Sequence, residues 1–336
     1  MKKNRLSRIV AAITRLALLA AVAGGAAPIG AAEQSAAGPQ PLRVYYIGNS
    51  VTDTVRYSSL ERMAAEAGKR IVWGRHMIPG APLSWLWDHG ELKEGKADGF
   101  VERPFGPCRV ALKDHPWDVV TLQPFDRRLQ SGGEKPDGDL EIAQAMIDLA
   151  VARNPNVRIF IYSRWPRMTR QGKGLAYDRN AFNENNPFSY RQVEPIDDYS
   201  DRWNAPYNPE GWGLTNESRE YFEKLTLALR ERNPKLAHPV CLIPVGDVMN
   251  ELHGLMKAGK APGYDSIYAV YKDAIHLNDV GSYIVGCTFY AVFFGESPEG
   301  RGAGQYRVED PALAKLIAQA AWRVVKGHRL SGVAAP

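Results

Sequence analysis

The sequence predicts a three-layer α/β/α sandwich built on a parallel sheet, and two observations support this prediction. Continuous apolar runs bounded by turn residues recur along the chain, as in strands that helices cover on both faces. Segments of helical periodicity separate these runs, and such alternation is typical of parallel α/β folds. The expected strands cover residues 42–47, 71–76, 117–123, 156–162 and 240–245.

Five helices are expected, three between the strands and two closing the chain. They cover about 57–68, 139–153, 217–232, 278–294 and 310–326. The third follows Thr215-Asn216 and ends at Asn233-Pro234, which are common start and stop signals. Asn278 is the expected N-cap of the fourth, because its side chain can accept a hydrogen bond from the first turn.

The first 32 residues are expected to be an export signal peptide. Four basic residues precede an apolar stretch at 9–23, and small residues at 30–32 offer a cleavage site. Arg15 interrupts the apolar stretch, which argues against a membrane-spanning helix. We expect residues 33–40 to be a linker and 41–330 to be a single domain. The mature protein should be periplasmic or secreted, without a membrane anchor.

The charge of the chain is concentrated in this predicted signal. The 336 residues include 42 Lys+Arg and 37 Asp+Glu, a net charge of +5. The first 32 residues hold five of the basic residues and no acidic one, so their removal leaves 37 of each. Affinity for phosphate backbones requires clustered positive charge, and no nucleic-acid partner is therefore expected.

Cys108, Cys241 and Cys287 would enter an oxidising compartment. They are interpreted as small buried hydrophobic residues. One disulfide could also form, with three pairings available, and the sequence does not choose between them.

Two short motifs at opposite ends of the expected domain carry candidate chemistry. The first strand breaks into Gly48-Asn49-Ser50 before a helix, a position where a serine hydroxyl can be a nucleophile. Far along the chain, Asp273-Ala274-Ile275-His276 opens another helix. An aspartate can hold an imidazole in one tautomer, so that the other nitrogen takes the proton of the serine. The motifs predict a catalytic triad of Ser50, Asp273 and His276.

These motifs resemble those of the SGNH/GDSL hydrolase superfamily. Its first block is Gly-Asp-Ser at the end of the first strand, and its last is Asp-x-x-His near the C-terminus. Here the last block continues as Leu277-Asn278, with Gly281 after it. The resemblance covers about 42–294 and implies a flavodoxin-like sheet of five parallel strands. Asn49 stands where most members carry aspartate, and it preserves a small polar turn residue.

Acyl transfer also requires donors to the negative charge that develops on the substrate oxygen. The amide of Ser50 is one expected donor. The family takes a second from a glycine after the second strand, and Gly80 matches it, although a plain Pro-Gly turn is an equal alternative. The third family donor, an asparagine after the third strand, is absent. Gln123 carries the same amide at that strand end and is expected to replace it.

Residues 164–216 interrupt the alternation of strand and helix. Nine aromatic residues and five prolines there predict an ordered irregular layer beside the active site, because so many aromatic residues disfavour disorder. Trp165 and Trp203 in this segment, together with Asn49, are the expected substrate-binding side chains.

No two histidines have a ligand spacing such as His-x-x-x-His, so no metal is expected. No Gly-x-Gly-x-x-Gly occurs either, and no cofactor is expected.

The sequence therefore predicts an exported serine esterase acting on a small-molecule or polysaccharide ester. Exported members of the family often remove acetyl groups from polysaccharides, which makes acetylated carbohydrate the expected substrate; lipid or aryl esters are alternatives. The competing hypothesis is a glycan-binding protein on the same fold, with a relaxed triad.

Overall fold

The computed structural model describes residues 40–102, 104–124, 129–133, 135–167, 198–208, 218–273 and 275–333. All of them lie in one compact unit, Pro39–Pro336. The expected signal peptide and all but the last residue of the expected linker lie outside the described residues.

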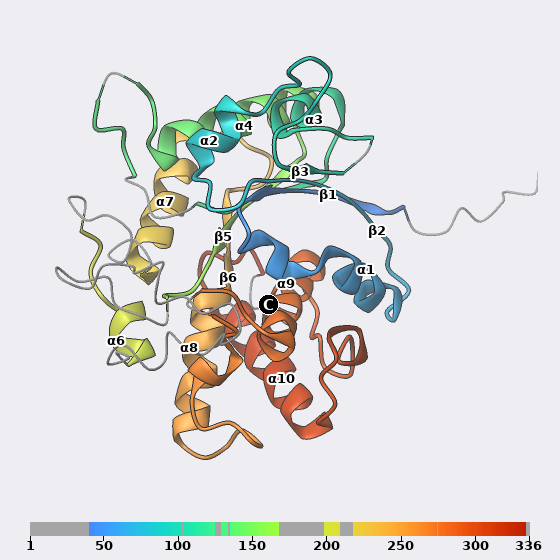
Figure 1. Ribbon diagram of the computed structural model, residues 1–336, viewed down its shortest axis with the longest axis vertical. Coiled ribbons are helices and arrows are strands. Elements are labelled where there is room, and N and C mark those ends of the chain that lie inside the picture. Colours follow the sequence, from blue (N-terminus) through green and yellow to red (C-terminus); the bar gives the residue numbers. More distant parts are fainter. Residues whose placement is uncertain are drawn as a thin grey trace, which may run out of the picture. The chain divides into compact units, whose positions relative to one another are not determined.

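A six-stranded, mostly parallel sheet forms the centre of the unit, in the order β3-β2-β1-β4-β5-β6 (Figure 1). The predicted three-layer α/β/α fold is confirmed, and each of the five expected strands has an observed counterpart. The prediction of five strands was one short, because the two-residue β3 pairs antiparallel with the end of β2. The strands are β1 (Leu42–Gly48), β2 (Ile71–Met77), β3 (Phe100–Val101), β4 (Val119–Leu122), β5 (Arg158–Ser163) and β6 (Cys241–Pro244).

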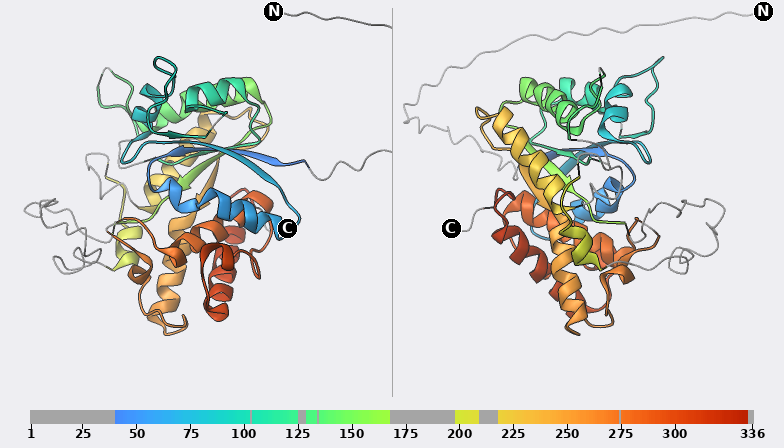
Figure 2. Two further views of the ribbon diagram at one scale, coloured as in Figure 1. Left: turned by 45° about the vertical axis from the view of Figure 1, so that its right-hand side comes forward. Right: turned by 90° about the vertical axis from the view of Figure 1, so that its left-hand side faces the viewer.

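Helices cover both faces of the sheet (Figures 1 and 2). One face carries α1 (Tyr57–Ala65), α8 (Val245–Lys257), α9 (Asp279–Phe294) and α10 (Pro311–Gly327). The other carries α2 (Leu83–Asp88), α3 (Cys108–Asp114) and α4 (Asp139–Arg153), and α7 (Arg219–Arg232) packs beside α4 and β5. The short α6 (Tyr199–Trp203) packs against α8. Single turns of 3-10 helix lie at η1 (Thr52–Val55), η3 (Ile267–Val270) and η4 (Gly304–Tyr306).

Five of these helices were expected with their bounds, and a sixth, α8, was expected without bounds between the last strand and the loop with Asp273. Helix α8 begins at Val245 directly after β6, so one apolar run covers the end of a strand and the start of a helix. Helices α2, α3 and α6 were not expected, because they have five to seven residues, too short for a periodic pattern to appear. Asn278 caps α9 as predicted, accepting a hydrogen bond from the Gly281 amide.

Part of the core lies between β1 and α9, where the Tyr46 ring packs against Phe289 and Phe293. Residues 44–48 of β1 are buried, and α9 is buried on nearly all sides. Such a helix is apolar all round, as expected for one enclosed by other elements. Gly286 permits this packing, because a Cβ atom there would lie 2.3 Å from the Tyr306 hydroxyl oxygen.

Neither edge of the sheet is left open along its whole length. At one edge, β3 pairs with the last two residues of β2. At the other, the Leu242 amide donates to the Leu330 carbonyl over 2.8 Å. The Arg230 guanidinium donates to the Val240 and Leu330 carbonyls beside it. The chain after α10 therefore covers β6.

Cys108, Cys241 and Cys287 are free and buried, in agreement with their interpretation as small hydrophobic residues. Burial raises the pKa of the Cys108 thiol to about 12. None of the helices in the described part of the chain has both the length and the apolar character needed to cross a bilayer.

Candidate active site

The turn after β1 is held by one buried side chain, Gln123, from the end of β4. Its Oε1 atom accepts hydrogen bonds from the Asn49 backbone amide at 3.2 Å and from the Thr52 hydroxyl at 3.1 Å. Only glycine fits at position 48, because a Cβ atom there would lie 1.9 Å from the Thr52 hydroxyl oxygen. The turn therefore presents the half-buried Ser50, two residues after Gly48, beyond the carboxyl end of β1.

His276 lies beside Ser50, although 226 positions separate them in the chain. Its Nε2 atom is 2.8 Å from the Ser50 hydroxyl oxygen. On the other side of the ring, Nδ1 lies 2.8 Å from Asp273 Oδ2 and 3.0 Å from Oδ1. The His276 side chain is 34% exposed, so the imidazole is open to solvent in part. The structure thus brings together all three residues of the predicted triad.

Asp273 is held as a carboxylate. Burial raises its pKa, but hydrogen bonds and the nearby charge of His276 outweigh burial and leave the pKa below its ordinary value. The amides of Ile275 and His276 add to this effect, since each donates to Oδ1 at 2.9 and 2.8 Å. An ionised acceptor at Nδ1 fixes the proton on that nitrogen and leaves Nε2 free to accept one.

The segment after β5 supports the loop that carries Asp273 and His276. The Trp165 indole nitrogen donates to the Ile275 carbonyl over 2.7 Å. The Tyr271 hydroxyl donates to the Pro166 carbonyl, also over 2.7 Å. Within the loop, the Lys272 amide donates to the His276 carbonyl at 2.9 Å. Sequence reasoning missed this support, because a hydrogen bond to a carbonyl leaves no residue-type signal.

Gly80 lies in the loop after β2, as expected. Its φ of +67° is in the left-handed region, the residue is exposed, and a Cβ atom would meet nothing within 4 Å. The Ile78 amide donates to the Gly48 carbonyl at 3.3 Å, and this hydrogen bond joins the loop to the turn that carries Ser50. Within the part of the chain that the structure describes, no acceptor takes the amide of Ser50 or of Gly80.

Gln123 does not occupy the expected donor position. Its side chain is fully buried, its oxygen faces the β1 turn, and its amide nitrogen donates to the Pro124 carbonyl. The expectation that it donates to substrate was therefore wrong. The longer side chain folds back and supports the backbone around Ser50 instead.

The three expected substrate-binding side chains are fully buried, and this expectation was also wrong. Trp165 supports the Ile275 carbonyl. Trp203 packs on Phe222 and donates to Asp247, and a Cβ atom on Gly246 would collide with its ring. Asn49 donates to the Ala81 carbonyl and accepts from the Val51 amide. None of these side chains offers a surface to substrate.

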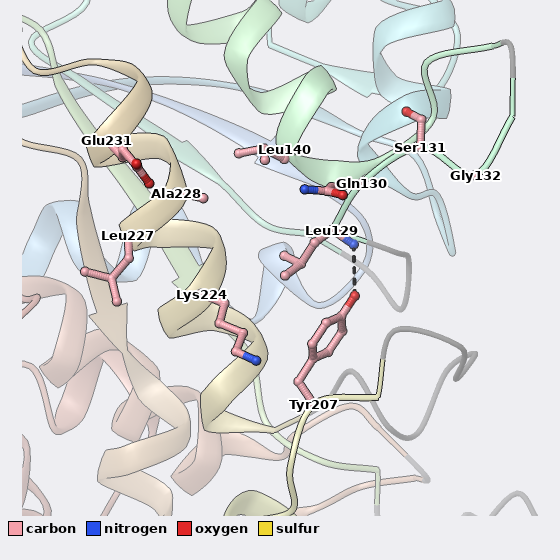
Figure 3. Close-up of a pocket in the computed structure, with 10 residues that line it drawn as sticks. All are labelled: Leu129, Gln130, Ser131, Gly132, Leu140, Tyr207, Lys224, Leu227, Ala228 and Glu231. Atoms are coloured by element: carbon pink, nitrogen blue, oxygen red, sulfur yellow. Dashed lines mark hydrogen bonds between the residues drawn. The ribbon is translucent and has the colours of Figure 1, made fainter.

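The predicted aromatic layer is described only in part, since residues 168–197 and 209–217 lie outside the described residues. Within the described part, Tyr207 is half-buried and lines a pocket of about 650 Å³ (Figure 3). Its hydroxyl accepts from the Leu129 amide at 3.3 Å, and the Lys224 ammonium lies 5.5 Å from its ring centre. The remaining lining residues are Gln130, Ser131, Gly132, Leu140, Leu227, Ala228 and Glu231.

Metal ligands do not gather anywhere in the described ranges: no group of three His, Cys, Asp or Glu side chains there could hold an ion. The prediction that the protein needs no metal or cofactor stays a prediction.

Comparisons with known proteins found only distant structural similarity. No family model matches the sequence, and no curated protein is similar to it at a significant level. A DUF4886 family protein from Bacteroides uniformis is 13% identical, with 85% of this chain and 95% of that chain covered and a TM-score of 0.49. A protein described as a GDSL-like lipase from Parabacteroides merdae is 14% identical, with 76% and 96% covered and a TM-score of 0.38. The periplasmic domain of a Salmonella Paratyphi A lipopolysaccharide acetyltransferase is 14% identical, with 61% and 67% covered and a TM-score of 0.29.

Replacing Trp165 with Phe should loosen the loop that carries His276. The ring is largely preserved, but the Ile275 carbonyl loses its donor, which should lower the free energy of unfolding by about 1–3 kcal/mol. Amide exchange at Ile275 and His276 should accelerate. Thermal unfolding and hydrogen exchange measure both effects. Trp85→Phe is the control, because Trp85 is 51% exposed and should change neither quantity. Equal effects of the two substitutions would refute the supporting role of Trp165.

Proposed function

We propose that the protein is a serine hydrolase that cleaves carboxylic esters. The observation that supports this is the alignment of three side chains: the serine oxygen lies 2.8 Å from one imidazole nitrogen, and a carboxylate lies 2.8 Å from the other. A serine that only forms a turn, or a histidine that only fills the core, would require neither of these contacts. Together they form the arrangement that activates a serine hydroxyl.

The residues suggest a two-step acyl transfer. Ser50 Oγ attacks the ester carbonyl as its proton passes to His276 Nε2, and Asp273 stabilises the imidazolium that forms. Collapse of the tetrahedral intermediate expels the alcohol, which takes the proton from Nε2 and leaves an acyl group on Ser50. Water then attacks this ester with the same imidazole as base, which releases the acid and restores the serine.

The negative charge on the tetrahedral intermediate needs donors that are already in place. The amides of Ser50 and Gly80 meet this requirement, because neither has an acceptor within the described residues and both lie in loops joined to the β1 turn. Two backbone donors are sufficient for a working oxyanion site. This assignment replaces the three-donor set expected from the sequence.

Acetylated carbohydrate is the proposed substrate, and export of the protein is part of the proposal. The aromatic composition of residues 164–216 suits sugar rings, and the basic and apolar segments of the first 32 residues suit a cleaved signal. The pocket in Figure 3, with Tyr207 in its lining, is the proposed binding place for sugar residues of a polymeric substrate.

A fluorophosphonate probe tests the hydrolase proposal directly. Only an activated serine reacts with it, so the purified protein should be labelled on Ser50, and Ser50→Ala should not be labelled. A folded wild-type protein that binds glycan without reacting would instead support the competing hypothesis of a glycan-binding protein.

Ser50, His276 and Asp273 should act as one unit. Ser50→Ala and His276→Ala should each remove nearly all turnover of a small acetate ester, and the double variant should be little worse than either. Initial rates of acetate release measure this. Additive losses would show that the two residues do not share a step, and a Ser50→Ala enzyme that remains active would exclude Ser50 as the nucleophile.

Gly80→Ala should lower kcat by about 10²-fold or more, since it displaces an amide expected to contact the oxyanion. Gly68→Ala is a matched control, because both glycines have φ near +68°, and an added Cβ would meet nothing within 4 Å at either position. The backbone strain is therefore the same, at roughly 1–2 kcal/mol. Gly68 lies between α1 and β2, at the end of the sheet where the parallel strands begin, so its substitution should leave kcat unchanged. Equal kcat values for the two variants would remove Gly80 from the site.

Filling the pocket beside Tyr207 should distinguish polymeric from small substrates. Ala228→Trp places an indole among the lining residues shown in Figure 3. Acetate release from an acetylated polysaccharide should fall at least several-fold, while hydrolysis of a small acetate ester should stay near the wild-type rate. Parallel losses on both substrates would show that the pocket does not bind polymer.

Export predicts that the mature protein begins near residue 33. Intact-mass measurement on protein recovered from outside the cytoplasm of the host would show the loss of about 32 residues. Recovery of the chain with Met1 retained would contradict export.

A further inference from the structure

We infer that Asn49 is a positioning residue for the oxyanion site, acting through a hydrogen bond to the backbone next to Gly80. This inference rests on the proposed ester hydrolysis and assigns a role to the residue that differs from the usual family motif. The Asn49 side chain is fully buried, and its Nδ2 atom donates to the Ala81 carbonyl over 3.1 Å.

Asn49 is bonded to both loops that carry the proposed oxyanion donors. In the turn that carries Ser50, the Oδ1 atom of Asn49 accepts from the Val51 backbone amide at 3.0 Å. The backbone amide of Asn49 donates to Oε1 of Gln123. On the other side, Nδ2 reaches a carbonyl 32 positions later in the chain. The side chain therefore ties together the two loops that carry the amides of Ser50 and Gly80, in addition to the backbone hydrogen bond from Ile78 to Gly48.

Two backbone hydrogen bonds shape the loop that holds Gly80: the Ile78 amide donates to the Gly48 carbonyl at 3.3 Å, and the Ala81 amide donates to the Ile78 carbonyl at 3.1 Å. They close a turn in which the exposed Gly80 takes the left-handed conformation. The Ala81 carbonyl lies at the far end of this turn, two peptide units after the one that carries the Gly80 N–H, and Ala81 itself is buried. A donor bound to that carbonyl fixes the far end of the turn relative to Ser50, and an oxyanion donor is effective only when its direction is set in advance.

The contact needs a donor, and this accounts for the amide at position 49. Aspartate has the same shape and could still accept from the Val51 amide, but its ionised carboxylate cannot donate to the Ala81 carbonyl. The departure from Gly-Asp-Ser thus matches a particular loop conformation in this chain.

Asn49→Asp tests the inference, because it restores the usual family residue and yet should impair the enzyme. On a small acetate ester, kcat should fall by about 10²-fold, the typical effect of losing one oxyanion donor. KM should stay within about threefold. The introduced carboxyl lies in a buried site, and its protonated form can donate to the Ala81 carbonyl. The ratio of variant to wild-type kcat should therefore rise as the pH falls, whereas ionisation of His276 is common to both enzymes and cancels.

Asn154→Asp is the matched control. Asn154 makes the same pair of contacts, since its Oδ1 accepts from the Asn156 amide at 3.1 Å and its Nδ2 donates to the Trp117 carbonyl at 2.7 Å. It lies between α4 and β5, at the end of the sheet where the parallel strands begin, whereas Ser50 lies where β1 ends. Its substitution should lower the melting temperature without changing kcat, KM or the pH profile.

Asn49→Ser provides a second, uncharged variant in case the carboxylate prevents folding. Serine can still accept from the Val51 amide but is too short to reach Ala81. It should lower kcat to a similar extent, with a ratio to wild type that does not change with pH.

The outcomes separate this inference from the proposed function. If wild-type turnover is absent or does not depend on Ser50, the proposed function fails. If Ser50-dependent turnover exists and either folded Asn49 variant retains wild-type kcat, the positioning role of Asn49 is refuted while the hydrolase stands. A kcat loss in Asn154→Asp equal to that in Asn49→Asp would also refute it, by showing a general effect of lost stability.

Discussion

One buried oxygen atom, Oε1 of Gln123, holds the geometry of the candidate site. It accepts from the Asn49 amide and the Thr52 hydroxyl, and so fixes the turn on both sides of Ser50. A buried acceptor with two donors is costly to disrupt, because the groups left behind would have neither a partner nor water. The parallel pairing of β1 with β4 brings Gln123 to this place, since Ile47 and Leu122 are register partners.

The half of the candidate site that holds Asp273 and His276 depends on carbonyl groups in a similar way. The Trp165 indole binds the Ile275 carbonyl, and the Tyr271 hydroxyl binds the Pro166 carbonyl, so the end of β5 holds the loop with Asp273. Large side chains near the site thus direct their polar ends inward to the backbone. Their bulk fills the core while their single donor sets the direction of a loop.

Sequence patterns and the family resemblance were sufficient to predict the fold class, five strands, the bounds of five helices and the three side chains that meet at the candidate site. Those features leave residue-type signals, such as continuous apolar runs, the Asn278 cap and the spacing of Asp273 and His276. The roles of Gln123, Trp165 and Trp203 could not be predicted, because residue type does not show whether a polar end meets substrate or a buried carbonyl. The short helices and β3 could not be predicted either, because they depend on tertiary contacts and are too short to show a periodic pattern.

The covering of the sheet edges bears on the solubility of the chain. An exposed edge strand presents unpaired amides and carbonyls to any other extended chain, which can start aggregation. Here β3 pairs with the end of β2, and the segment near Leu330 occupies β6 with help from Arg230. A truncation that removes Leu330 would expose the Leu242 amide and leave β6 as an unpaired edge strand. The last residues of the domain thus protect the β6 edge from pairing with another chain.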